Sequence, residues 1–246
     1  MTVPILEAKS IVYSYPDGTP ALNGVSLSLG AGEKIALVGA NGSGKTTLLL
    51  ILSGALAPRG GEILLRGEDV SGRASALNKA AGLVFQDPDD QLFMPTVAED
   101  AAFGLVSKGV PAREARDAAV SCLESLGARR LAARPPHRMS GGEKRIAALA
   151  GILVTEPEIL ILDEPTSGLD PAARRNIVKT LENMDSTMLI GTHDLDMALG
   201  LCDRVLVMHG GAITAKGAPK EILTDGALMR KNGLDLPLRY SESENL

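Results

Sequence analysis

The chain has 246 residues, of which 45% are hydrophobic and 22% charged, so it can bury a sizeable core and is not expected to be disordered. A formal net charge of -5 and an aromatic content of 2% argue against a basic groove lined with stacking rings, and we expect no nucleic acid partner. Cys122 and Cys202 fit neither a metal pair nor a disulfide framework, which indicates a reducing compartment.

The N-terminal ten residues contain Glu7 and lack a basic leader, so no secretory signal is predicted. The longest apolar run, residues 48–57, has roughly half of the ~20 residues that a membrane-spanning helix needs. The sequence therefore predicts a soluble chain that reaches a membrane only through a separate partner.

Short apolar runs alternate with Gly and Pro in the first third of the chain. This pattern predicts strands at residues 8–15, 22–29, 34–38 and 61–65 and a helix over 44–56. Between residues 87 and 139 the composition changes to Ala-rich segments, such as 110–126, which predict a compact helical insertion.

The alternation of strand and helix resumes after the insertion. Nearly continuous apolar runs at 158–163 and 187–192 are typical of buried parallel strands, and a helix over 171–183 would complete a βαβ unit. Residues 205–208 and 212–215 predict a terminal hairpin, and the polar tail 241–245 is expected to fray. The fold class is therefore α/β with a mostly parallel sheet.

Residues 39–46 read Gly-Ala-Asn-Gly-Ser-Gly-Lys-Thr, and they lie between an apolar strand and a helix. In that context the spacing is typical of a phosphate-binding loop, because the glycines let backbone N–H groups curl around phosphate oxygens at a helix N-terminus. Lys45 would reach the β and γ phosphates, and the Thr46 hydroxyl would bind Mg²⁺.

Asp163 and Glu164 follow the apolar strand at 158–162, at the strand end where open α/β sheets bind ligands. We expect Asp163 to hold the Mg²⁺ shell and Glu164 to orient and deprotonate the attacking water. An acidic pair at a strand end is alternatively a solvated turn or a helix cap. The glycine loop favours the catalytic interpretation.

Residues 139–144, Met-Ser-Gly-Gly-Glu-Lys, resemble the signature motif of the ATP-binding subunits of ABC transporters, with Met in place of the usual Leu. The resemblance implies that Ser140 and the N–H groups of Gly141 and Gly142 form a second anion site, which grips the γ phosphate held by another subunit. On its own, the same sequence would be a flexible turn or a helix N-cap.

Other motifs follow in the order of the ABC family. Gln86 is similar to its Q-loop glutamine, Asp170 to the last residue of its D-loop, and His193 to its switch histidine. The alternatives are a solvent-facing glutamine, a helix-capping turn and a structural histidine. Tyr15 stands where the family stacks an aromatic ring on adenine, although a core role for Tyr13 or Tyr15 stays open.

The resemblance implies ATP and Mg²⁺ as cofactors and the following site residues. Catalytic roles are expected for Glu164, His193 and Gln86, and Mg²⁺ ligation for Thr46, Gln86 and Asp163. Nucleotide binding is expected for Tyr15, Gly39, Asn41, Gly42, Ser43, Gly44, Lys45, Thr46, Thr47, Ser140, Gly141, Gly142, Glu143 and Asp170.

The resemblance also implies the fold: a P-loop NTPase of the ABC ATPase type, with an antiparallel β subdomain and an inserted helical subdomain beside the mostly parallel core. We expect one ABC ATPase domain over residues 1–246. The expected parts are the nucleotide-binding core (1–86 and 140–205), the helical subdomain (87–139) and the C-terminal hairpin and tail (206–246).

Residues 84–93, 95–100 and 103–104 resemble the ATPases of energy-coupling-factor importers, particularly the cobalt and nickel branch, and residues 15–18 and 234–237 agree. This implies an ATPase on the cytoplasmic face of the membrane that powers Co²⁺ or Ni²⁺ import. Its partners would be a second copy or a paralogous ATPase, a transmembrane energy-coupling subunit and a substrate-binding membrane subunit. A vitamin or another substrate stays an alternative, whereas the short insertion and negative charge disfavour an ABC ATPase acting on nucleic acid or ribosomes.

Leu92, Phe93 and Met94 form an apolar cluster after the Q-loop. Exposed apolar clusters often mark partner sites, so the cluster predicts a docking surface for a membrane subunit. The alternative is that Leu92 and Phe93 fill the core of the helical subdomain.

Overall fold

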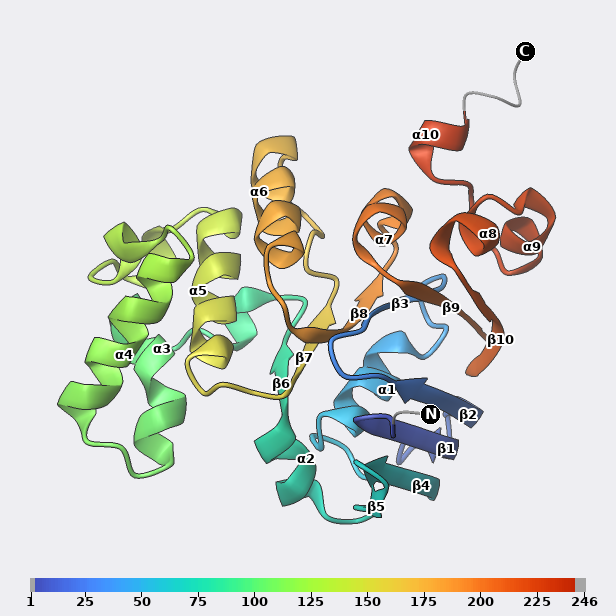
Figure 1. The fold of residues 1–246 in the computed structure, drawn as a ribbon, viewed down its shortest axis with the longest axis horizontal. Helices are drawn as coiled ribbons and strands as arrows, with labels where there is room; N and C mark the ends of the chain where they lie inside the picture. The colour runs from blue at the N-terminus through green and yellow to red at the C-terminus, as the bar shows by residue number, and fades with distance from the viewer. Residues whose placement is uncertain (1–2, 242–246) are drawn as a thin grey trace. The chain divides into compact units, whose positions relative to one another are not determined.

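A computed structural model describes residues 3–241 of the chain, which form two compact units. Within the described residues, the first unit comprises 3–83, Glu158–Glu164 and 185–241, and the second comprises Val84–Pro157 and Pro165–Met184. Each unit is built from chain segments that are distant in sequence (Figure 1).

The first unit is built around a six-stranded sheet with the strand order β10-β9-β3-β8-β7-β6. Its strands are β3 (Lys34–Val38), β6 (Ala81–Val84), β7 (Ile159–Asp163), β8 (Thr187–Thr192), β9 (Arg204–His209) and β10 (Ala212–Gly217). The central neighbours β7, β8, β3 and β9 are parallel, while β10 returns antiparallel to β9. All residues of β7 and β8 are buried, as their continuous apolar runs predict.

A second, antiparallel sheet has the order β2-β1-β4-β5. Its strands are β1 (Leu6–Ser14), β2 (Pro20–Leu29), β4 (Gly60–Leu65) and β5 (Glu68–Asp69). Helix α1 (Lys45–Leu52) contacts β2 of this sheet and β7 and β8 of the larger one, so one apolar core joins both sheets through it. The expected antiparallel β subdomain is confirmed.

The remaining helices of the first unit are short: α2 (Ala74–Ala80), α7 (Leu195–Leu201), α8 (Pro219–Leu223), α9 (Gly226–Lys231) and α10 (Leu238–Ser241). The helix expected over 44–56 ends at Leu52, because Gly54 takes a left-handed conformation with φ of 81°. The expected frayed tail lies outside the described residues from position 242 onward.

The second unit is helical. Its elements are α3 (Val97–Ser107), α4 (Ala112–Ser125), α5 (Gly141–Leu153), α6 (Pro171–Glu182) and the 3-10 turns η1 (Pro88–Asp90), η2 (Arg129–Leu131) and η3 (Pro136–Arg138). Helix α5 packs on α3, α4 and α6, so the compact helical unit extends beyond the segment 87–139. A Cβ on Gly142 would lie 2.8 Å from the Ala173 Cβ, and the close approach of α5 to α6 therefore depends on glycine there. No helix between residues 3 and 241 is both long and apolar enough to cross a bilayer.

Candidate active site

The phosphate loop follows β3 and has a backbone that only glycine permits at several positions. Gly42 and Gly44 have φ of 77° and 101°. A Cβ on Gly44 would lie 2.6 Å from the Ala21 carbonyl oxygen, and one on Gly39 would collide with the carbonyl of Met208. The glycine spacing is thus explained by close backbone approach on both flanks of the loop.

Lys45 begins α1, and its ammonium is folded back over the loop. Nζ donates to the carbonyl oxygens of Gly39 and Ala40, at 2.8 and 3.3 Å. The N-cap residue Gly44 makes no side-chain cap, which leaves the first N–H groups of α1 for an anion. The buried Ser43 hydroxyl has no hydrogen-bond partner within residues 3–241. Since buried polar atoms are normally partnered, these donors fit a site completed by the phosphates of ATP.

Glu164 has a left-handed backbone, with φ of 47°, a conformation that costs a non-glycine residue about 1–3 kcal/mol. Its N–H donates to the Gly191 carbonyl at 2.7 Å. Its buried carboxylate has Oε1 at 3.9 Å from Lys45 Nζ, and Oε2 at 2.8 Å from His193 Nδ1. Oε2 also accepts the His193 backbone N–H at 3.1 Å. Both oxygens face nitrogen groups, which fixes the orientation of this side chain.

Asp163 and Thr46, the expected Mg²⁺ ligands in the first unit, both offer oxygen atoms, and they lie on the neighbouring elements β7 and α1. Asp163 ends β7 and is 5% exposed, while Thr46 lies on the exposed side of the first turn of α1. A Cβ on Gly191 would lie 3.2 Å from Asp163 Oδ1, so β8 makes room for this carboxylate. A carboxylate and a hydroxyl are the ligands that Mg²⁺ combines with phosphate oxygens, and the residues fit the ion.

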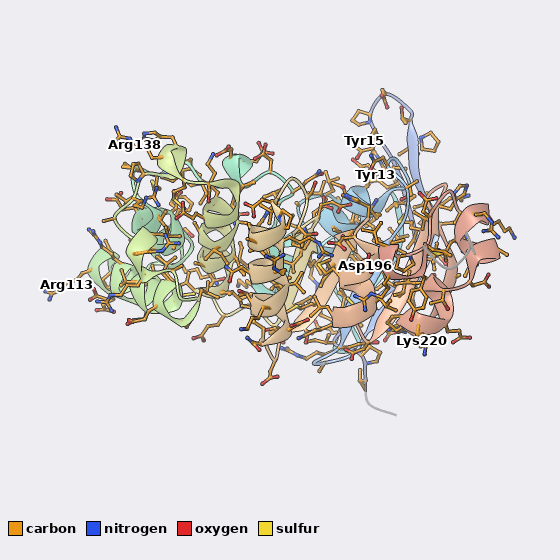
Figure 2. The ribbon with its side chains drawn as sticks, turned by 90° about the horizontal axis from the view of Figure 1, so that it is seen from above. Tyr13, Tyr15, Arg113, Arg138, Asp196 and Lys220 are labelled. Atoms are coloured by element: carbon orange, nitrogen blue, oxygen red, sulfur yellow. The ribbon has the colours of Figure 1, made fainter. Side chains whose placement is uncertain are left out.

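Tyr13 and Tyr15 stand at the end of β1, where their rings pack edge to face with centroids 5.3 Å apart (Figure 2). Tyr13 is 7% exposed and belongs to the core, whereas Tyr15 is 38% exposed. The Tyr15 hydroxyl lies 2.8 Å from the Thr47 hydroxyl oxygen on α1. The core alternative thus applies to Tyr13, whereas the Tyr15 ring is accessible, as stacking on adenine would require.

Gln86 lies in the second unit, two residues after the end of β6, with an exposed side chain. Its carbonyl, like that of Phe85, accepts a hydrogen bond from the guanidinium of Arg145 on α5. The same guanidinium donates to the Ser167 carbonyl at 3.1 Å. Arg145 is 4% exposed and joins three motif segments, yet motif reasoning missed it. The available signal was a charged residue inside the apolar run of the signature helix.

The signature residues form a helix cap. Ser140 Oγ accepts the Glu143 N–H at 3.3 Å, and Glu143 Oε2 accepts the Ser140 N–H at 3.1 Å, which is a complete capping box at the start of α5. Glu143 Oε1 pairs with Arg130 at 2.6 Å and Arg134 at 2.9 Å. Its pKa is lowered, chiefly by the hydrogen bond from Arg130 and also by that from Ser140. The N-cap alternative is therefore realised in this structure.

Asp170 also caps a helix, because its Oδ1 accepts the N–H groups of Ala172 and Ala173 at the start of α6. In the Q-loop segment, Asp87 caps η1 and Asp89 pairs with Lys144 at 2.6 Å. The predicted site residues thus divide between the units. The first unit brings together Tyr15, Gly39, Asn41, Gly42, Ser43, Gly44, Lys45, Thr46, Thr47, Asp163, Glu164 and His193, and the second holds Gln86, Ser140, Gly141, Gly142, Glu143 and Asp170.

Comparison with known proteins agrees with this geometry. The ABC transporter family matches residues 22–167, more than half of the chain. The energy-coupling factor transporter ATP-binding protein EcfA of Methanothermobacter thermautotrophicus is 44% identical over 239 residues, covering 95% of this chain and 77% of that protein.

Two solved structures show the same fold. The structure of cbiO1 from Clostridium perfringens, part of the ABC transporter complex cbiONQ, is 39% identical with a TM-score of 0.82, covering 98% of this chain and 99% of that one. A dimeric post-hydrolysis structure of the ATP-binding cassette MJ0796, bound to ADP and Pi, is 25% identical with a TM-score of 0.78, covering 87% and 98%. The expected fold and cofactors are confirmed, and the chain belongs to the ABC transporter family as an ATP-binding subunit that hydrolyses ATP with Mg²⁺.

Proposed function

We propose that this ATPase powers the import of Co²⁺ or Ni²⁺ through separate membrane subunits, from the cytoplasmic face of the membrane. The observation that carries the proposal is the likeness to cbiO1 of a cbiONQ complex over nearly the whole of both chains. The EcfA relative supports the energy-coupling part of the proposal. The residues 84–104, which resemble the cobalt and nickel branch, support the choice of cargo.

For the chemistry we propose a division of labour within the first unit. Lys45 and the N-terminus of α1 hold the phosphates, which fixes the γ phosphate for in-line attack. Glu164 accepts the proton of the attacking water. His193, whose Nδ1 lies 2.8 Å from Glu164 Oε2, holds the water against the phosphate. Mg²⁺, held by Thr46 and Asp163, supplies charge neutralisation on the phosphate oxygens when bound.

For assembly we propose a head-to-tail pair of ATPase chains. Each chain has one phosphate loop and one signature helix, and these lie in different compact units. The signature end of α5, at Ser140, would complete the nucleotide site of the opposite chain. The dimeric arrangement of the similar cassette MJ0796 supports this proposal.

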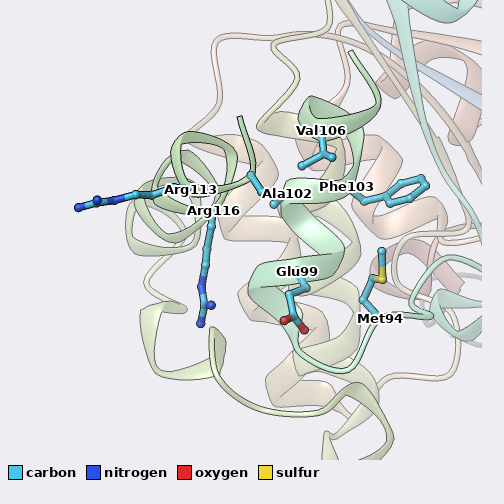
Figure 3. Close-up of a pocket in the computed structure, with 8 residues that line it drawn as sticks. Met94, Glu99, Ala102, Phe103, Val106, Arg113 and Arg116 are labelled. Carbon is cyan, nitrogen blue, oxygen red and sulfur yellow. The ribbon is translucent and has the colours of Figure 1, made fainter. Parts of the chain in front are cut away.

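For docking we propose a groove on the second unit as the seat of a membrane subunit. The groove encloses about 420 Å³ beside α3 and α4, and Met94 and Phe103 lie on one side of it with Arg116 on the other (Figure 3). Phe93 packs edge to face on Phe103 at 5.0 Å and is 64% exposed, so it does not fill the helical core. Asp100 accepts the N–H groups of Phe93 and Met94 at 2.9 Å, which holds the segment in place.

The test is uptake by the assembled transporter. The chain is co-expressed with candidate membrane subunits of an energy-coupling transporter, and accumulation of radiolabelled Co²⁺ and Ni²⁺ is compared with that of labelled vitamins. We expect uptake of one of the two metals, and none with the Glu164→Gln chain. Vitamin uptake without metal uptake would replace the cargo while keeping the energy-coupling role.

A further inference from the structure

The turn between β9 and β10 contacts the phosphate loop from outside the nucleotide motifs. In the sheet Val207 of β9 lies opposite Val38 of β3, so the end of β9 reaches the first residues of the loop. The Gly211 N–H donates to the Ser43 carbonyl at 3.1 Å, and the Gly211 carbonyl accepts the Asn23 N–H at 2.8 Å. One residue of the turn thus joins the phosphate loop to β2.

The space around Gly211 is about as restricted as that around Gly39 and Gly44 of the phosphate loop. A Cβ on Gly211 would lie 2.7 Å from the Ala21 carbonyl oxygen, the same atom that a Cβ on Gly44 would approach to 2.6 Å. Gly210 and Gly211 have φ of 54° and 76°, as a two-residue hairpin turn of this kind requires. Gly210 differs in one respect, because a Cβ there would meet nothing within 4 Å.

Asn232, the residue that follows helix α9, contacts both strands of this hairpin. Asn232, 2% exposed, accepts the Thr214 hydroxyl of β10 at 2.6 Å and donates from Nδ2 to the Leu228 carbonyl at 2.8 Å. The Asn232 carbonyl oxygen lies 3.2 Å from Nδ1 of His209, the last residue of β9. The side chain and the backbone carbonyl of Asn232 together tie this residue to the end of β9 and to the third residue of β10.

We propose that Gly211 is a positioning residue for ATP binding and that the turn it belongs to holds the phosphate loop in its binding conformation. A loop that is curved before the ligand arrives binds more tightly, because less ordering accompanies binding. The Asn232 network would hold the turn in place, and this part of the C-terminal segment would contribute to nucleotide affinity without contacting the nucleotide.

The test compares Gly211→Ala with Gly210→Ala, since both place a side chain at a positive φ but only the first meets the Ala21 carbonyl. Affinity for Mg-ATP and for inorganic tripolyphosphate is measured by titration calorimetry, and folding by thermal unfolding. We expect Gly211→Ala to weaken both ligands about tenfold or more, while Gly210→Ala stays within about twofold. A folded Gly211→Ala chain with normal affinity, or equal losses in both variants, would overturn the proposal.

If Gly211→Ala does not fold, Thr214→Val decides, because it keeps the side-chain shape and removes the hydroxyl's bonds to Asn232 and to the Val207 carbonyl of β9. Its matched control is Thr224→Val, which removes a similar hydroxyl bond, to the Lys220 carbonyl. We expect the KM for ATP to rise about two- to fivefold in Thr214→Val with kcat retained, and no change in Thr224→Val. An unchanged KM in Thr214→Val, or the same rise in both variants, would contradict the proposal.

Discussion

Two glycine-rich segments each lead into a helix, and they differ in how the start of that helix is capped. At α1 the N-cap is Gly44, which has no capping side chain, and the nearby Ser43 hydroxyl is buried without a partner in the described chain. At α5 Ser140 and Glu143 cap one another completely. The α1 segment leaves its N–H and hydroxyl donors for a ligand, whereas the α5 segment forms its own capping box. A binding role for the second segment must therefore rest on the N–H groups that the capping box does not use.

The comparison is tested most strongly by Glu164→Gln, which removes the proposed base that faces Lys45 at the start of α1. The amide keeps the size of the side chain but accepts no proton, so we expect kcat to fall about 10²- to 10⁴-fold while ATP still binds. Phosphate release and nucleotide titration measure the two effects. Glu156→Gln is the matched control, because Glu156 also has a left-handed backbone, with φ of 52°, but lies exposed. A near-normal rate in Glu164→Gln would assign the base elsewhere.

Elements that depend on local spacing were predicted well from the sequence. The phosphate loop and the strand before Asp163 are contiguous patterns, and the structure places them as expected. The choice between Tyr13 and Tyr15 needed burial, which depends on how both sheets close over the hairpin. Arg145 was missed because its partners are backbone carbonyls, whose positions no side-chain pattern reports.

The extent of the helical unit also depended on tertiary packing. Helix α5 follows the signature in sequence, and the motif order places it with the nucleotide-binding core. Its buried face nonetheless packs on α3 and α4. The periodicity of a helix shows which face is buried but not against which neighbour.

A second prediction asks whether the self-capped segment acts on another chain. Ser140→Arg places bulk at the start of α5, and Lys45→Ala removes the phosphate ligand, so each variant alone should lose at least about tenfold in ATPase rate. Mixed in equal amounts, they should regain part of the activity, because a mixed dimer has one intact composite site. Ser140→Ala controls for loss of the hydroxyl and its cap, about 1 kcal/mol, without added bulk. Mixed dimers that form and stay inactive would exclude a shared site.

A third prediction separates docking from catalysis in the second unit. Phe93→Ser removes an exposed ring beside the groove, so we expect uptake and co-purification with membrane subunits to fall several-fold while the ATPase rate of the isolated chain changes less than about twofold. Val3→Ser, which alters another side chain with 65% exposure, serves as the control. Normal assembly and uptake in Phe93→Ser would contradict the docking role.

The smallest expected effect concerns the self-capped segment itself. The pKa of Glu143 is lowered, first by the Arg130 hydrogen bond, so the ionised carboxylate stabilises the folded chain. This stabilisation is complete above the ordinary Glu pKa of about 4.3 and is lost as the pH falls through the lowered folded-state value. Glu143→Gln should therefore reduce the free energy of unfolding by about 0.5–1 kcal/mol at pH 7, and the difference from the parent chain should shrink towards pH 3.

Denaturant unfolding at several pH values measures this difference, with Glu124→Gln as the control. Glu124 pairs with Arg129 at an exposed site, where both side chains are more than half accessible, so its loss should cost no more than about 0.5 kcal/mol. The cap interpretation places the effect of Glu143→Gln in stability and leaves ATP affinity unchanged. A loss of ATP-dependent dimerisation at unchanged stability would show instead that the Glu143 carboxylate acts on the nucleotide of the opposite chain.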